Sequence, residues 1–260
     1  MDRTEIISKI YNGCDEQSRL EKSRHGQLEY LTTMHYIHKF VPAGAKVLEV
    51  GAGTGRYSVA LAKEGYDVTA IELVEHNLDI LRCNARCIEN IAVHQGDATD
   101  LSAFASNTFD AVLLLGPMYH LYERAEQDSA INEAIRVAKT GGVIMAAFLS
   151  IHAIMYADYF CGNFTSGAEF NFDSEYHAKH FKEQGFTGFD IDEFEALFTD
   201  KPVQKLAIAG TDSVLPIAEG MNCFKMDDAD FAKYADYHLK TCEKRELLGA
   251  QSHLLYVCRK

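Results

Sequence analysis

Residues 47–57 read Val-Leu-Glu-Val-Gly-Ala-Gly-Thr-Gly-Arg-Tyr, an apolar run that enters a glycine-rich turn and continues into a helix-forming sequence. Glycine lets the backbone turn tightly and lets a ligand approach it closely. In open α/β sheets, nucleotides bind at such a turn between a strand and the following helix. The stretch therefore predicts a strand over Val47–Val50 and a ligand beside Gly51, Gly53 and Gly55.

The glycine spacing separates this turn from two other nucleotide-binding loops. The dinucleotide fingerprint G-x-G-x-x-G needs a third glycine at position 56, which is Arg56 here. The lysine of an ATP-binding phosphate loop is missing as well. What remains is Gly-x-Gly-x-Gly with Glu49 two residues before it. An ATP-binding phosphate loop is therefore excluded at this turn, and an NAD-dependent oxidoreductase is disfavoured.

Short β-rich runs and helical segments alternate after this turn. The predicted strands are Val47–Val50, Asp67–Ile71, Ile91–His94, Phe109–Leu115 and Val143–Leu149, with helices over Gly55–Glu64, Glu75–Cys87 and Gln127–Lys139. The last of these strands is apolar throughout, as a strand buried on both faces should be. This alternation indicates an α/β fold of the Rossmann-like type, with a mostly parallel sheet and helices on both faces.

The chain is expected to divide into three parts of one domain. Residues 1–44 have a helical pattern and predict an N-terminal helical cap, and residues 45–150 form the cofactor-binding Rossmann-like core. Residues 151–260 are expected to supply a lid or insertion and the closing strands. Two of these strands, near Leu206–Gly210 and over Leu254–Cys258, are predicted to pair antiparallel at the sheet edge. The sheet would then have seven strands.

Composition and charge narrow the function classes. Lys and Arg total 25 against 38 Asp and Glu, a formal charge of −13 with no basic stripe, so nucleic acid is a poor partner. The seven cysteines are scattered and predict neither a disulfide framework nor a metal site. The longest apolar runs are too short to span a membrane, and the first ten residues lack the apolar core of a secretory signal. We therefore expect a cytoplasmic protein without a membrane partner.

Further motifs follow the other predicted strands. Glu72 ends the second strand, 21 positions after Gly51, and Gly96-Asp97-Ala98 follows the third. The fourth begins with Phe-Asp-Ala-Val at residues 109–112, and residues 136–142 read RVAKTGG. Together with the glycine turn, these residues resemble the class I S-adenosylmethionine-dependent methyltransferases, in which the last stretch is commonly RVLKPGG. The resemblance covers residues 45–150 in the right order.

This resemblance implies S-adenosyl-L-methionine as the cofactor. It implies that the cofactor-binding residues are Glu49, Gly51, Gly53, Gly55, Glu72, Leu73, Asp97, Ala98 and Leu115, and it implies no metal. In the family, the acid at Glu72 binds the ribose hydroxyls, and a carboxylate can accept both hydroxyl hydrogens. The acid at Asp97 lies near the adenine amine. Two alternatives stay open, namely that Asp97 closes a turn with Gly96 and that Glu49 steadies the glycine turn.

The segment after the fourth strand carries the candidate catalytic residues. Residues 116–121 read GPMYHL and resemble the GPLYHL stretch of a bacterial subgroup of the family that acts on small molecules. Ligands bind at this edge of open α/β sheets. His120 can take a proton near neutral pH, and Tyr119 can position a nucleophile. The alternative is that His120 caps the following helix and Tyr119 packs under the lid.

The resemblance thus implies methyl transfer to an oxygen or nitrogen of a small-molecule acceptor by in-line displacement. Aromatic residues are expected to wall the acceptor site; they are Tyr156, Tyr159, Phe160, Phe164, Phe170 and Phe172. Two alternatives remain besides the oxidoreductase: a regulator that binds the cofactor without turnover, and a methyltransferase acting on a macromolecule. The identity of the acceptor and the oligomeric state do not follow from the sequence.

Overall fold

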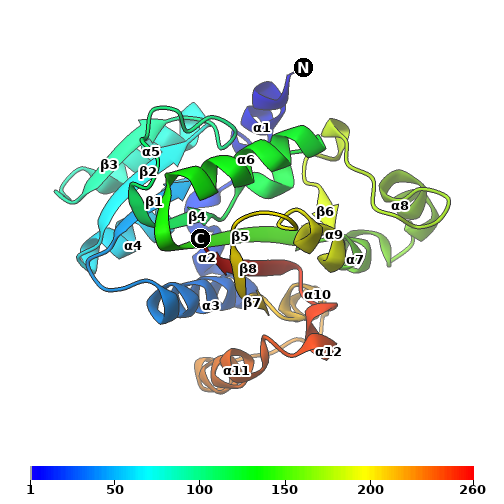
Figure 1. The fold of residues 1–260 in the computed structure, drawn as a ribbon. Helices are drawn as coiled ribbons and strands as arrows, with labels where there is room; N and C mark the ends of the chain where they lie inside the picture. Colours follow the sequence, from blue (N-terminus) through cyan, green and yellow to red (C-terminus); the bar gives the residue numbers. More distant parts are fainter. Residues whose placement is uncertain (1) are drawn as a thin grey trace.

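The computed structural model describes residues 2–260 and shows a central β-sheet with helices on both faces (Figure 1). The strands follow the order β3-β2-β1-β4-β5-β8-β7. Their bounds are β1 (Lys46–Val50), β2 (Asp67–Glu72), β3 (Ile91–Gln95), β4 (Phe109–Leu114), β5 (Ala138–Ser150), β7 (Gln204–Gly210) and β8 (His253–Arg259). Strands β1 to β5 run parallel, and β8 is antiparallel to β5 and β7. The expected Rossmann-like α/β fold and its antiparallel edge pair are confirmed.

The expectation of seven strands is wrong by one. Strand β6 (Gly188–Phe189) pairs parallel with Leu149 and Ser150 at the end of β5, which makes the sheet eight-stranded. β5 has 13 residues and runs beyond its last pairing with β4, between Leu114 and Ala146. Two residues of another segment are enough to pair with this projecting end. A strand of two residues carries no periodic pattern, so it could not be recognised from the sequence.

The helices divide among three parts of the chain. Before β1 lie α1 (Arg3–Tyr11), the 3-10 turn η1 (Glu16–Ser18), α2 (Arg19–Lys22) and α3 (Arg24–Phe40). Among the parallel strands lie α4 (Arg56–Lys63), α5 (Glu75–Ala85), the 3-10 turn η2 (Pro117–His120) and α6 (Arg124–Val137). After β5 come α7 (Ile151–Ile154), the π-helical turn η3 (Met155–Tyr159), α8 (Phe164–Asn171), the 3-10 turn η4 (Lys182–Gln184), α9 (Ile191–Ala196), α10 (Leu215–Glu219), α11 (Asp228–Thr241) and α12 (Arg245–Leu248). Among the described residues, no helix combines the length and the apolarity that crossing a bilayer demands.

The alternation of side chains along β1 places one functional residue inside the core. Leu48 and Val50 pack on the face covered by α6, whereas Val47 packs on the face covered by α3 and α4. Glu49 lies on this second face and is 1% exposed. A buried carboxyl is costly unless it is hydrogen-bonded or protonated, so Glu49 is not there for packing alone.

The parallel strands bring their carboxyl ends to one edge of the sheet. The glycine turn after β1, Glu72 at the end of β2, Asp97 after β3 and η2 after β4 all lie at this edge. In such sheets this edge forms the ligand crevice. The N-terminal segment returns to the same edge, because Arg3 of α1 forms an ion pair with Asp97.

Candidate active site

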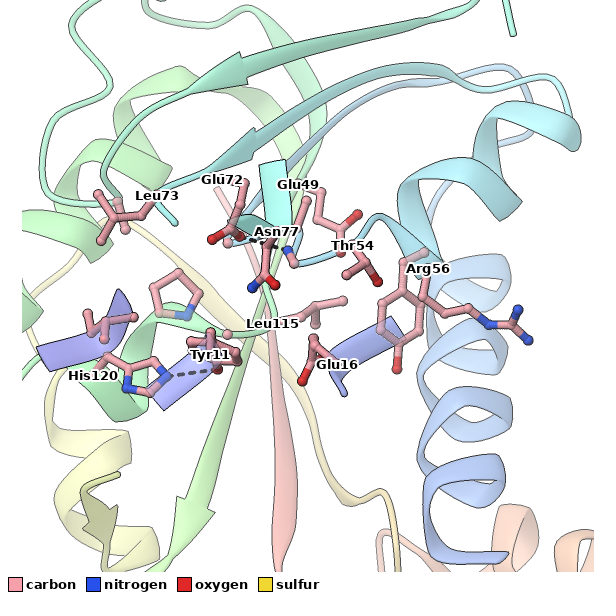
Figure 2. Close-up of a pocket in the computed structure, with 18 of the residues that line it drawn as sticks. Tyr11, Glu16, Glu49, Thr54, Arg56, Glu72, Leu73, Asn77, Leu115 and His120 are labelled. Atoms are coloured by element: carbon pink, nitrogen blue, oxygen red, sulfur yellow. Dashed lines mark hydrogen bonds between the residues drawn. The ribbon is translucent and has the colours of Figure 1, made fainter. Parts of the chain in front are cut away.

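A pocket opens at the carboxyl ends of β1 to β4 (Figure 2). It encloses about 890 Å³, including a part that is open to solvent. Most of the residues predicted from the sequence line it; they are Glu49, Gly51, Gly53, Glu72, Leu73, Asp97, Ala98, Leu115, Tyr119 and His120. Gly55 does not line it. The structure therefore brings ten of the eleven predicted residues together around one cavity.

The three glycines of the turn have the left-handed backbone but different surroundings. Their φ angles are +73° at Gly51, +56° at Gly53 and +87° at Gly55. A Cβ added at Gly55 would lie 2.2 Å from Leu81 Cδ1, so this glycine lets α5 pack closely. A Cβ at Gly53 would instead meet only the Glu16 side chain, at 3.6 Å. Gly53 is thus the position where the turn leaves room on the pocket side.

Glu72 accepts backbone hydrogen bonds with both carboxylate oxygens, one of them from the glycine turn. Its Oε2 accepts from the Gly53 amide and its Oε1 accepts from the Val74 amide, both at 2.8 Å. Burial raises the pKa of Glu72, and these amide donors oppose that shift. Each carboxylate oxygen has a second lone pair. Glu72 can therefore hold the turn and still accept hydrogen bonds from two ribose hydroxyls.

Glu49 combines a structural contact with a place in the pocket wall. The Ser58 hydroxyl of α4 donates a short hydrogen bond to its Oε2. Burial raises the pKa of Glu49 to about 8, so the carboxyl is largely protonated at neutral pH. An ammonium group placed beside it would favour the ionised form. The contact with Ser58 supports the steadying role, and the pocket position leaves the ammonium role available.

Asp97 is held both by its own turn and by the N-terminal helix. Its Oδ1 accepts from the Thr99 amide and the Thr99 hydroxyl, each at 2.9 Å. Its Oδ2 accepts from Arg3 Nη2 at 2.5 Å, and Arg3 Nε lies 3.1 Å from Glu126. Asp97 therefore stabilises the turn that follows β3 through its Oδ1 atom. Its other oxygen lies at the pocket wall, with an arginine as its present partner.

Seven N-terminal residues line the pocket, and the sequence singled out none of them as functional; those used below are Arg3, Tyr11, Glu16 and Arg19. They lie on α1, η1 and α2, and their contacts with the core join residues about a hundred positions apart, as Arg3 with Asp97 and Tyr11 with His120. Arg19 Nε also donates to Glu16 Oε1 at 3.0 Å. Local periodicity predicts a helix but not what it covers.

His120 is a neutral, fully hydrogen-bonded histidine. Its Nδ1 lies 3.0 Å from the Gly185 carbonyl, which can only accept, so Nδ1 carries the proton. Its Nε2 therefore accepts from the Tyr11 hydroxyl at 2.9 Å. Burial lowers the pKa of His120 to about 4. The expectation that it titrates near its ordinary value of about 6.5 is wrong, because the ring is shielded from water.

The simple alternative stated for these two residues fails for His120 but holds for Tyr119, whose ring centroid lies 5.9 Å from that of Phe186 in the segment after β5. His120 does not cap α6, whose N-cap residue is Glu123; it fixes the loop at Gly185 instead. Tyr119 is buried, and its hydroxyl donates to the Leu115 carbonyl at 3.2 Å. Burial raises the pKa of Tyr119, so it stays a neutral phenol. Tyr119 lines both this pocket and a second cavity.

The second cavity adjoins the first and shares four wall residues with it: Tyr11, Glu16, Arg19 and Tyr119. Its other walls come from the segment after β5 and from the C-terminal part of the chain. Of the six aromatic residues expected to wall an acceptor site, Tyr159 and Phe170 line it, together with Phe186. Tyr156, Phe160 and Phe164 are exposed, and Phe172 packs against Ile151 and Met155. The expectation of an aromatic wall thus holds for two of its six members.

Glu72→Ala is expected to weaken S-adenosylmethionine binding by about 1–3 kcal/mol, because it removes the acceptor for two hydroxyls. Calorimetric titration measures this change. Glu75→Ala is the matched control, since Glu75 is an exposed acid three residues away that does not line the pocket. Equal dissociation constants for the wild type and the Glu72 variant would remove Glu72 from the site.

The comparisons with known proteins agree with this geometry. Residues 47–142 match the family model described as a methyltransferase domain. The chain is 38% identical over 107 residues to a demethylmenaquinone methyltransferase of Renibacterium salmoninarum, covering 41% of this chain and 42% of the relative. It is 35% identical over 140 residues to that of Clavibacter sepedonicus, covering 54% and 55%. The chain thus spans about half the length of the curated relatives it matches.

Solved structures extend the likeness to the whole fold. A SAM-dependent methyltransferase of Thermotoga maritima superposes with a TM-score of 0.61 and 18% identity, covering 98% of this chain and 99% of the other. One from Methanosarcina mazei gives 0.57 and 19%, covering 86% and 96%. Among residues 2–260, no group of three or more His, Cys, Asp or Glu is arranged to hold a metal. Residues 47–142 are therefore similar to methyltransferase domains, and the fold around them is that of the SAM-dependent methyltransferase structures.

Proposed function

We propose that this chain transfers the methyl group of S-adenosyl-L-methionine to a small-molecule acceptor. The observation that carries the proposal is the junction of two cavities, which share Tyr11, Glu16, Arg19 and Tyr119 as walls. One cavity has the glycine turn and Glu72 of a methyltransferase domain, and the other has aromatic and polar walls suited to an organic molecule. The relatives named demethylmenaquinone methyltransferase support a small-molecule acceptor.

The residues of the first cavity fit the cofactor. Gly53 leaves space where any other residue would place a Cβ, Glu72 offers lone pairs to the ribose, and Glu49 lies ready for the ammonium. Leu73, Ala98 and Leu115 supply apolar wall beside them. The bound cofactor supplies an activated methyl on a sulfonium, so the protein's tasks are positioning and electrostatics.

In-line displacement explains why the two cavities meet. The nucleophile must approach the methyl carbon from the side opposite the leaving sulfur. Holding both partners in line lowers the activation free energy by several kcal/mol. We place the methyl beside Leu115 and Tyr119, where one cavity opens to the other. The N-terminal segment lies over this junction, where the Tyr11 hydroxyl donates to His120 and the Glu16 side chain lies nearest to Gly53.

This function assigns a task to each part of the chain. Residues 1–44 form the cap over both cavities, residues 45–150 bind the cofactor, and residues 151–260 complete the acceptor cavity and the sheet. The formal charge of −13 disfavours a nucleic-acid acceptor. A macromolecular acceptor would also have to reach a junction that the N-terminal helices cover.

Calorimetric titration of three ligands tests the proposed function. S-adenosylmethionine and its demethylated product are expected to bind with one-to-one stoichiometry, whereas NAD is expected to give no heat of binding. A protein that binds NAD in preference would be an oxidoreductase. A protein that binds the donor but transfers its labelled methyl group to no compound of a cell extract would instead fit a cofactor-binding regulator.

A further inference from the structure

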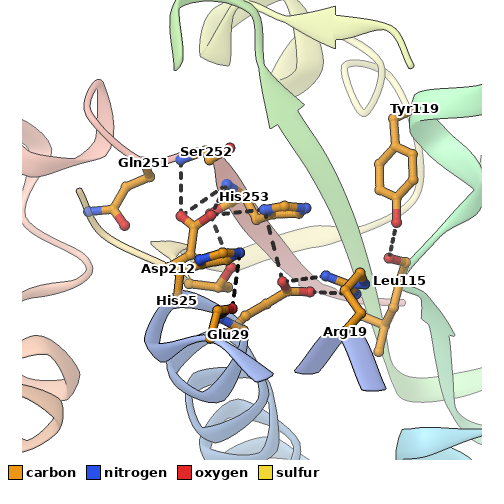
Figure 3. A network of polar contacts seen from close by, with 12 residues as sticks. Arg19, His25, Glu29, Leu115, Tyr119, Asp212, Gln251, Ser252 and His253 are labelled. Atoms are coloured by element: carbon orange, nitrogen blue, oxygen red, sulfur yellow. Dashed lines mark hydrogen bonds and ion pairs between the residues drawn. The ribbon is translucent and has the colours of Figure 1, made fainter. Parts of the chain in front are cut away.

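A histidine–aspartate pair in the second cavity is not accounted for by the cofactor site. His253 begins β8 and lines this cavity, and its Nδ1 lies 2.9 Å from Asp212 Oδ2 (Figure 3). The ring centroid of His253 lies 6.5 Å from that of Tyr119, which lines both cavities. His253 thus faces the acceptor side of the junction.

Asp212 fixes the ring of His253. The Asp212 side chain is fully buried, and its Oδ1 accepts from the amides of Ser252 and His253 at 3.0 and 3.1 Å. These donors hold the carboxylate in place, so its Oδ2 accepts a hydrogen bond from the Nδ1–H group of His253. In neutral His253 the lone pair is then on Nε2.

The Nε2 atom of His253 is open to the cavity. No residue within 2–260 forms a hydrogen bond with it. It is not a buried orphan either, because the Thr32 hydroxyl is the one buried side-chain nitrogen or oxygen of the described residues that lacks a partner. Nε2 therefore reaches the open space of the cavity. By contrast, both ring nitrogens of His120 are engaged.

The charges around His253 favour taking up a proton. Burial alone would lower its pKa, but Glu29 and the hydrogen bond to Asp212 outweigh this and raise the pKa above the ordinary value. Glu29 Oε2 lies 4.0 Å from His253 Nδ1, and Arg19 binds Glu29 through two hydrogen bonds of 2.7 and 3.0 Å. A base works best when its pKa lies near the working pH.

Most of the other charged groups that line this cavity are paired with neighbouring side chains and do not bind the Nε2 atom of His253. Glu16 is paired with Arg19, Asp15 with Lys22 and His25 with Glu219. Tyr119 stays a neutral phenol, because burial raises its pKa. Asp158 has no partner among the described residues, and burial raises the pKa of its carboxyl. His253 is thus the imidazole of this cavity with a fixed tautomer and a free nitrogen.

From this geometry we propose that His253 is the general base of methyl transfer and that the acceptor carries a phenolic hydroxyl. This inference rests on the proposed function. Nε2 takes the O–H proton, the phenolate oxygen bonds to the methyl carbon, and the C–S bond breaks with its electron pair going to sulfur. The products are an aryl methyl ether, the neutral thioether and an imidazolium held by Asp212, which returns its proton to solvent.

The walls and the charges favour a phenol over an amine. Proton transfer from a phenol creates a phenolate in direct contact with an imidazolium, and these opposite charges attract each other. An ammonium acceptor would start as a cation facing a histidine that must itself become a cation. Apolar and aromatic side chains complete the cavity and suit an aromatic ring; they are Leu149, Ile154, Tyr159, Phe170 and Phe186.

The test uses 4-nitrophenol, whose phenolate is coloured, with the full-length protein saturated with the demethylated product. At a pH below the phenol's own pKa, the wild type is expected to bind it as the coloured phenolate. His253→Gln keeps a donor for Asp212 but has no base, so it is expected to lose the colour and to slow transfer to this phenol about 10²–10⁴-fold. His38→Ala, which changes an exposed histidine of α3, is the matched control.

Asp212 acts through His253, and a pH profile separates this positioning role from a structural one. The rate of transfer is expected to fall at acidic pH as His253 is protonated, and Asp212→Asn should move that midpoint to lower pH. A variant that is merely destabilised would keep the wild-type midpoint per folded molecule. Melting temperatures and the affinity for the demethylated product are measured for every variant.

Three outcomes would overturn the inference without touching the proposed function. The first is a His253→Gln protein that still binds the coloured phenolate. The second is a wild type that binds the demethylated product but neither 4-nitrophenol nor the two-ring phenol 4-methylumbelliferone. The third is methylation of amines but not of phenols. If the protein fails to bind the methyl donor at all, the proposed function itself fails.

Discussion

Gly53→Val is expected to weaken S-adenosylmethionine binding by more than about 100-fold, which corresponds to roughly 3 kcal/mol. The backbone at Gly53 has a φ of +56°, and the space into which a Cβ at this position would point belongs to the pocket. A branched side chain would fill the space through which the cofactor approaches the turn. Titration calorimetry measures the loss.

Gly65→Val is the control for backbone strain in this experiment. Gly65 also has a left-handed backbone, with a φ of +93°, and no atom lies within 4 Å of its added Cβ. Both variants should therefore pay a similar conformational cost of about 1–2 kcal/mol. Only the Gly53 variant should lose the ligand. If the two variants bind the donor equally well, the cofactor does not lie against this turn.

The free energy of unfolding is expected to fall by about 3 kcal/mol between pH 6.5 and pH 4 because of His120 alone. Its pKa is lowered to about 4 by burial, whereas the unfolded chain takes up the proton near pH 6.5. The stabilisation from this group is thus complete above pH 6.5 and is lost as the pH falls toward 4. His253 has the opposite sign, since its raised pKa stabilises the fold below pH 6.5.

Denaturant unfolding of the wild type and His120→Asn over this pH range isolates the effect. Asparagine can still donate to the Gly185 carbonyl but does not titrate. The difference in unfolding free energy between the two proteins should shrink as the pH falls. A constant difference from pH 6.5 to 4 would mean that the pKa of His120 is the same in the folded and unfolded protein. His120 would then again be a candidate for the general base.

The core of the fold could be predicted because its signals are local. A strand, a glycine turn and a helix follow one another within residues 47–57, and Glu72 and Asp97 recur at the ends of the next strands. Parallel pairing then brings these residues to one edge, since successive strands are neighbours or follow known crossovers. The predicted site residues met in one cavity for this reason.

The contacts that complete the site could not be predicted, because they join distant parts of the chain. Tyr11 meets His120 across 109 positions, and Asp212 meets His253 across 41. The pKa of His120 depends on burial by the loop at Gly185, which no local pattern records. Gly55 shows a related limit, since its place in the motif did not reveal that it faces Leu81.

A crystal structure of the protein with S-adenosylhomocysteine tests the central claim most directly. We expect the ribose hydroxyls on the Glu72 carboxylate and the sulfur beside Leu115 and Tyr119. The side of the sulfur that carries the methyl group in the donor should face the cavity that His253 lines. A nucleoside bound away from the glycine turn would contradict the account. So would a sulfur that faces away from the second cavity, because no acceptor there could then reach the methyl group in line.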